Sequence, residues 1–143
     1  MAHTMIGETP TNIGEEVTLK GWVDAKRDHG TVTFIDLRDR TGIVQCVAVK
    51  KMQEVTQESV VSIQGLIKER PEHMVNDELA TGGIEIEVKD YEILNAAEAL
   101  PLPIDSDGYD IKEEVRLRER HVDLRRPRLR RNLKLRSDYI QAF

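Results

Sequence analysis

Cysteine is almost absent from this chain: Cys46 is the only one among 143 residues. A single cysteine excludes an internal disulfide bond and any zinc cluster built from cysteines. Cys46 stands between Gln45 and Val47 in an apolar run, which predicts a small buried side chain. We therefore expect a cytoplasmic protein, because the cytoplasm keeps thiols reduced.

Long apolar runs are also missing. No stretch approaches the roughly 20 apolar residues of a transmembrane helix, so we expect no membrane association. Residues 1–6 lack the basic start and apolar centre of a secretory signal.

Catalytic motifs are missing as well. The sequence contains no nucleophile–base pair, no Gly-rich phosphate loop and no cluster of metal ligands. Its histidines are scattered without ligand spacing, at His3, His29, His73 and His121. We therefore predict no catalytic residue, no metal site and no cofactor in this chain, and expect it to bind without catalysing.

Charge is distributed unevenly along the chain. The net charge is −5, yet residues 116–136, here called the basic segment, hold ten Lys/Arg against two Asp/Glu. Such a step marks a boundary between two units. An acidic total also argues against unselective coating of nucleic acid, which needs broad positive surface.

Alternating apolar residues predict five strands. The spacing of Met52 and Val55 predicts a short helix within residues 50–58. Three strands, a helix and two strands follow the order of the five-stranded Greek-key barrel called the OB-fold, a mainly β fold. We assign residues 1–96 to this barrel, 97–110 to a Pro-containing linker and 111–143 to C-terminal helical segments. The predicted strands span residues 17–24, 31–38, 43–49, 59–68 and 84–93.

OB-folds bind ligands across their second and third strands, so the outward residues there are candidates. Ile35 and Leu37 are the natural core residues of the second strand, which leaves Phe34 facing outward. An exposed ring here suits stacking on an unpaired base; alternatively, Phe34 packs under a loop. Gln45 is the one amide in an apolar strand and can pair with a base edge or simply face water.

The loops that frame this face add polar candidates. We expect Lys26 and Arg27 in the first loop, and Arg70 and Asn76 in the loop between the fourth and fifth strands. Glu85 is on the outward parity of the fifth strand and can accept hydrogen bonds. Each of these residues is equally explained by ordinary surface polarity, and only their convergence on one face favours a site.

Several phrases resemble the N-terminal region of bacterial-type aspartyl-tRNA synthetases, over nearly the whole chain. The most specific phrase is Val122-Asp-Leu-Arg-Arg-Pro-Arg-Leu-Arg-Arg-Asn-Leu133. The others are Gly21-Trp-Val23, Arg27-Asp-His-Gly30, Phe34-Ile-Asp-Leu-Arg-Asp-Arg40, Gly42-Ile-Val-Gln45, Arg70-Pro-Glu72, Val75-Asn76, Ala80-Thr-Gly-Gly-Ile-Glu85 and Leu100-Pro101.

The resemblance implies an anticodon-binding OB domain whose partner is the tRNA anticodon loop. It implies that Phe34 stacks on the middle anticodon base, a uridine, and that Gln45 helps to identify this base. The residues implied near the other anticodon positions are Arg27, Arg70, Asn76 and Glu85. Ala25-Lys26-Arg27 replaces three basic residues of many members, which implies weaker phosphate contact.

His29 bears on which tRNA is chosen. Relatives with His at this position of the Arg-Asp-x-Gly turn often charge both aspartate and asparagine tRNAs. The other reading is a turn histidine with no role.

The resemblance also implies a longer parent that is a homodimer and uses ATP and Mg²⁺ to attach aspartate to tRNA. Residues 111–143 would be a hinge and the truncated start of its class II catalytic domain. We expect most arginines of the basic segment to pair with the rest of that domain rather than with the tRNA backbone.

Two other functions remain open at this point. One is a stand-alone OB-fold protein that binds single-stranded nucleic acid without sequence preference. The other is an interaction module that pairs with another chain through residues 110–143.

Overall fold

The structure is a computed structural model that describes residues 3–142. The chain divides into two compact units, one up to Ala99 and one from Leu100 onward. The division lies within the predicted linker. Among the described residues no helix is long and apolar enough to cross a membrane.

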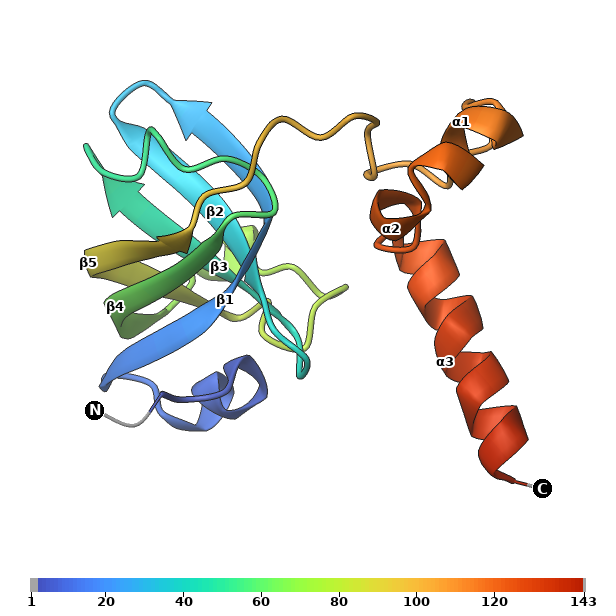
Figure 1. The fold of residues 1–143 in the computed structure, drawn as a ribbon. Coiled ribbons are helices and arrows are strands. Elements are labelled where there is room, and N and C mark those ends of the chain that lie inside the picture. The colour runs from blue at the N-terminus through green and yellow to red at the C-terminus, as the bar shows by residue number, and fades with distance from the viewer. Residues whose placement is uncertain (1–2, 143) are drawn as a thin grey trace. The chain divides into compact units, whose positions relative to one another are not determined.

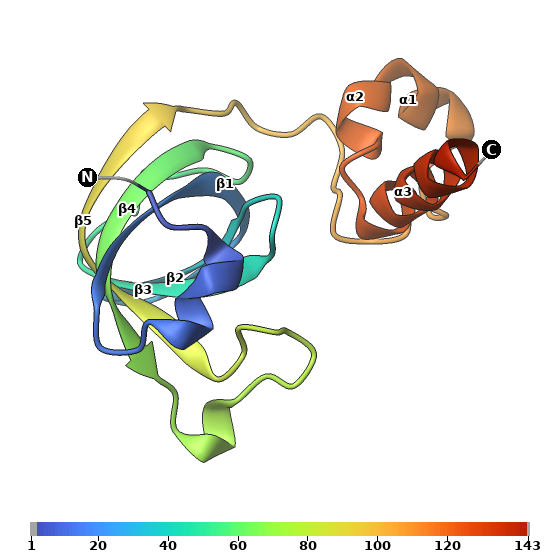
Figure 2. The same cartoon turned by 90° about the horizontal axis from the view of Figure 1, so that it is seen from below.

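The first unit is a closed five-stranded barrel with the strand order β1-β2-β3-β5-β4 (Figures 1 and 2). Its β3–β5 pairing is parallel and the other pairings are antiparallel. The mainly β OB-fold prediction is confirmed. The strands are β1 (Glu16–His29), β2 (Val32–Arg38), β3 (Ile43–Val49), β4 (Val60–Glu69) and β5 (Ile84–Asn95).

Alternate residues of every strand fill the barrel, as a period of two requires. The 3-10 helix η1 (Ile6–Thr11) adds Ile6 to this core, and a second 3-10 helix, η2 (Glu72–Met74), lies between β4 and β5. Burial raises the pKa of the Cys46 thiol, which suits the predicted small apolar role. Fully buried core residues include Leu19, Val23, Ile35, Leu37, Val44, Cys46, Ala48, Met52, Val61, Ile63 and Ile86.

The predicted helix within residues 50–58 is wrong. This connection consists of turns, with positive φ angles at Lys50, Met52 and Glu58. A right-handed helix cannot pass through such angles. Met52 and Val55 are nevertheless buried in the barrel core, so their spacing reported burial and not helical geometry.

The second unit contains α1 (Glu113–Arg118), α2 (Arg120–Asp123) and α3 (Pro127–Gln141). Pro127 begins α3, where its missing N–H costs nothing. Leu102 and Ile104 pack with Val122 in a small core. Part of the predicted linker is therefore packed into this unit.

Candidate nucleic-acid interface

A bulge in β1 determines which side chains share the outer face with Phe34. The register of β1 on β2 shifts between Val23, which pairs with Leu37, and Ala25, which pairs with Asp36. The extra residue, Asp24, reverses the inside–outside alternation beyond it. Arg27 and His29 therefore share the outer face with Phe34, although unbroken alternation from Val23 would point them into the barrel.

The Phe34 ring lies on this outer face. It is partly exposed, while its neighbours Ile35 and Leu37 are fully buried. The His29 ring meets Phe34 edge-on, with centroids 5.7 Å apart and planes at 81°. Val47 is the cross-strand partner of Phe34 on β3. The result is a small apolar platform with one aromatic face, a surface that suits stacking by a nucleobase.

Arg27 and Asp36 form an ion pair beside this platform. Arg27 Nη2 lies 3.0 Å from Asp36 Oδ1, and about half of the Arg27 side chain is exposed. Burial raises the pKa of Asp36 above its ordinary value, and the charge of Arg27 opposes that rise only in part. Arg27 therefore keeps solvent-facing N–H groups for an anionic ligand while it neutralises Asp36.

Arg70 connects three parts of the barrel. Its Nη2 donates a hydrogen bond to Gln45 Oε1, and its Nε lies 3.7 Å from Glu85 Oε2. Its Nη1 donates to the carbonyl oxygens of Met74 and Gly82 at 3.3 and 3.5 Å. Arg70 thus contacts both Gln45 and Glu85, residues predicted from separate segments.

Comparisons with known proteins agree with this geometry. Residues 17–94 match the tRNA anticodon family, described as an OB-fold nucleic acid binding domain. The chain belongs to this family.

Relatives of the OB domain carry it within much longer chains. The aspartate–tRNA(Asp/Asn) ligase of Moorella thermoacetica is 49% identical over 142 residues, which cover 94% of this chain and 24% of that protein. The aspartate–tRNA ligase of Shouchella clausii is 46% identical over 140 residues, covering 92% and 24%. The chain thus spans about a quarter of the length of these relatives, and the aspartyl-tRNA synthetase resemblance is confirmed.

Solved structures share the architecture. The asparaginyl-tRNA synthetase of Pyrococcus horikoshii complexed with asparaginyl-adenylate superposes with a TM-score of 0.78 at 28% identity. This match covers 99% of the present chain and 33% of that one. An OBody bound to hen egg-white lysozyme matches 72% of the chain with a TM-score of 0.57 at 26% identity and is itself 98% covered.

Two predicted site residues of the OB domain point elsewhere. Lys26 is in β1 rather than in a loop, and its Nζ lies 2.5 Å from the Gln53 carbonyl oxygen and 3.3 Å from Asp28. Its strand partner is the core residue Ile35, so Lys26 is on the opposite side of β1 from Arg27. Asn76 is exposed in the β4–β5 connection, and its Oδ1 accepts a hydrogen bond from the Glu78 N–H at 3.1 Å. The expectation that Lys26 and Arg27 occupy a loop is wrong, because pairing with β2 extends β1 to His29.

Asp36 was missed as a candidate of the outer face. Its parity with Phe34 was the available signal, because both residues alternate with the buried Ile35 and Leu37. Its contact with Arg27 depends on the β1 bulge, which no alternation pattern shows. Among the described residues no group of His, Cys, Asp and Glu has the geometry of a metal site.

Several arginines of the basic segment bind groups of the second unit itself. Asp123 is fully buried and lies within 3.1 Å of Arg116, Arg120 and Arg126. Arg126 is also fully buried and donates to the carbonyl oxygens of Ser106 and Pro103 at 2.7 and 2.6 Å. These three arginines thus pair within their own unit, and the expectation that most arginines of the basic segment pair with the rest of a catalytic domain stays a prediction.

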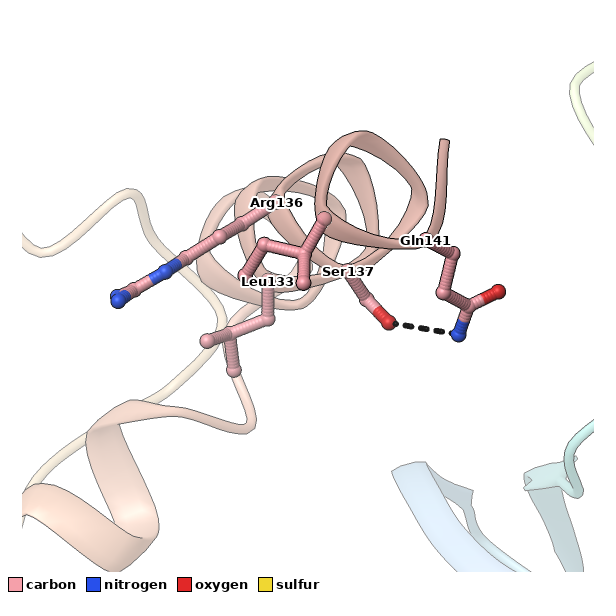
Figure 3. A pocket seen from close by; sticks show the side chains of 5 residues that line it. Leu133, Arg136, Ser137 and Gln141 are labelled. Carbon is pink, nitrogen blue, oxygen red and sulfur yellow. Dashed lines mark hydrogen bonds between the residues drawn. The ribbon is translucent and has the colours of Figure 1, made fainter. Parts of the chain in front are cut away.

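Helix α3 keeps an exposed apolar side. Leu133 and Ile140 are 46% and 62% exposed. With Arg136, Ser137 and Gln141 they line a shallow groove of about 330 Å³, in which Gln141 donates to Ser137 at 3.4 Å (Figure 3). This groove contains no titratable pair that could do chemistry.

Proposed function

We propose that this chain is the anticodon-recognition part of an aspartate–tRNA ligase. The observation that carries the proposal is the outer face of β1, β2 and β3, where Phe34 is flanked by Gln45 and by the partly exposed cation of Arg27. Single-stranded RNA loops are commonly read in this way, by stacking on an aromatic ring and by hydrogen bonds to base edges.

The test is a titration of the 143-residue chain with an aspartate anticodon stem-loop. Phe34→Ala should weaken binding by about 1–3 kcal/mol, because one stacked base is lost. Leu94→Ala is a matched control, since Leu94 is a 45% exposed apolar residue of β5, outside the face formed by β1, β2 and β3. Unchanged affinity in Phe34→Ala would remove the ring from the site. Equal affinity of the parent for unrelated RNA loops would instead favour a single-strand binder without sequence preference.

Relaxed tRNA choice is part of the proposal. The Moorella relative is named for both aspartate and asparagine tRNAs. His29 is exposed and touches the Phe34 ring, so a base next to the stacked one would meet it. Stem-loops that differ only in the last anticodon base should bind with similar affinity. A strong preference for the aspartate version would argue for strict selection by this domain.

The remaining functions belong to the proposed parent protein. We place ATP and Mg²⁺ binding outside these residues, since no phosphate-binding loop or acidic metal cluster occurs in the described part of the chain. Exposed Leu133 and Ile140 on α3 support pairing of two subunits through this helix. A cytoplasmic location suits the single, buried and unpaired Cys46.

A further inference from the structure

Arg70 is a cation that the barrel hides from solvent. Only 8% of its side chain is exposed, although it borders the proposed RNA-binding face. A phosphate-binding arginine needs an accessible guanidinium. The contacts of Arg70 instead run to Gln45, to Glu85 and to two carbonyl oxygens of the β4–β5 connection.

The contact with Gln45 determines how that amide is oriented. A guanidinium has only donors, so the Gln45 atom that Arg70 touches must be the carbonyl oxygen. The arginine itself is fixed, because its Nη1 is bound to Met74 and Gly82. A flip of the Gln45 amide would place two sets of N–H groups against each other. The orientation is thus set by chemistry and not by a choice between look-alike atoms.

The other end of the Gln45 amide is left for a ligand. Nε2 is not among the buried unsatisfied atoms, and no hydrogen bond to it occurs in the described part of the chain. The positive charge of the Arg70 guanidinium next to Oε1 also polarises the amide and strengthens Nε2 as a donor. Gln45 therefore turns its N–H donors toward the face, while its acceptor oxygen is turned toward Arg70.

The position of Gln45 lets this donor meet a stacked base. Asp36 is the direct partner of Gln45, and Val47 is the direct partner of Phe34. Gln45 and Phe34 are therefore diagonal neighbours on one face, within reach of large groups. A pyrimidine stacked on Phe34 would direct one edge toward Nε2.

We propose that Arg70 is a positioning residue that makes Gln45 select a base with a carbonyl edge. Uracil presents the O4 acceptor where cytosine presents the N4 amino group, and only the former can receive a hydrogen bond from Nε2. Stacking on Phe34 cannot separate the two bases, since every base has a π-face. The inference rests on the proposed RNA-binding function.

The experiment compares two anticodon stem-loops that differ only by uracil or cytosine at the base stacked on Phe34. The parent chain should prefer uracil by about 10-fold or more, as one well-made contact to a base edge provides. Arg70→Met keeps an apolar stem but frees the amide to turn. In this variant the cytosine loop should bind more tightly than it binds the parent, and the preference should fall within about 3-fold.

A merely structural role for Arg70 predicts a different pattern, in which both RNAs lose affinity together and their ratio stays constant. That result would overturn the inference and leave the proposed function intact. Failure of the parent to bind either RNA would overturn both. Arg70→Lys retains a cationic donor but loses the planar fork that binds Gln45, Met74 and Gly82 together, so it should restore only part of the uracil preference.

Gln45→Glu provides an independent variant that does not remove the buried arginine. Its carboxylate would remain paired to Arg70 and would offer only acceptors to the face. The preference should reverse toward cytosine, whose amino group can donate. A Gln45→Glu chain that still prefers uracil as strongly as the parent would contradict the assignment.

Discussion

Replacement of Arg126 by methionine tests whether the second unit depends on its buried ion cluster. Arg126 is fully buried, and its guanidinium binds Asp123 at 2.7 Å as well as Ser106 and Pro103. Methionine fills part of the same volume but leaves the two carbonyl oxygens without this donor. Removal of one partner from a buried pair costs about 3–5 kcal/mol.

This cost is large for so small a unit. At roughly 0.05–0.15 kcal/mol per residue, the unit from Leu100 onward would have a total stability of only a few kcal/mol. Arg126→Met should therefore unfold this unit or bring it close to unfolding. The barrel should keep its stability, because its core, which extends from Ile6 to Val88, does not include any residue of the second unit.

Hydrogen exchange followed by mass spectrometry resolves the two units. Peptides from α2 and α3 should lose protection in Arg126→Met, while peptides from β3 and β4 keep it. Arg120→Met is the matched control, because Arg120 also binds Asp123 but is 48% exposed and should cost less than about 1 kcal/mol. Equal loss in both variants would refute the cluster argument, and joint loss in the barrel would refute the independence of the units.

Two further predictions concern acid and the β4–β5 connection. Burial raises the pKa of Asp123, but hydrogen bonds from Arg116 and Arg126 outweigh it and bring the pKa below the ordinary 3.8. The ionised Asp123 carboxylate thus contributes its full stabilisation above pH 3.8, and this stabilisation is lost as the pH falls through the lower pKa of the folded state. Asp123→Asn should therefore destabilise the second unit at pH 7. In acid unfolding curves the stabilities of the variant and the parent should converge. In an RNA titration, Gly82→Ala should weaken binding and Gly83→Ala should not. A Cβ on Gly82 would lie 1.8 Å from the Asn76 carbonyl oxygen, while a Cβ on Gly83 would meet open space. Equal affinities of the two variants would show that the β4–β5 connection does not support the site.

Strand positions were the most predictable part of the fold. The limits of β2 and β3 agree with the alternation pattern to within one residue, because each has one face in the core. The same period placed Phe34 outside and Ile35 inside. Apolar spacing alone cannot distinguish a helix from successive turns, and for this reason the connection around Met52 was mispredicted.

The contacts of the site were less predictable than its residues. The sequence pattern selected Gln45, Arg70 and Glu85 one by one, on polarity and parity. The contacts of Arg70 with Gln45 and Glu85 depend on the path of the connection between β4 and β5. In this connection the backbone N–H of Arg70 donates a hydrogen bond to the Gly83 carbonyl oxygen at 2.9 Å. No local rule predicts such a closure, since it joins residues separated by a polar loop of irregular structure.

The bulge at Asp24 shows why this site needed an irregularity. Lys26 and Arg27 are adjacent cations, and strict alternation from Val23 would have directed Arg27 into the barrel and Lys26 outward. The bulge exchanges them, so that Arg27 meets Asp36 at 3.0 Å while Lys26 binds Gln53. Asp24 itself is held by Arg38, which also binds Glu58 through both carboxylate oxygens at 3.0 Å. The ion pairs of Arg38 with Asp24 and Glu58 thereby support the register that presents Arg27 and His29 beside Phe34.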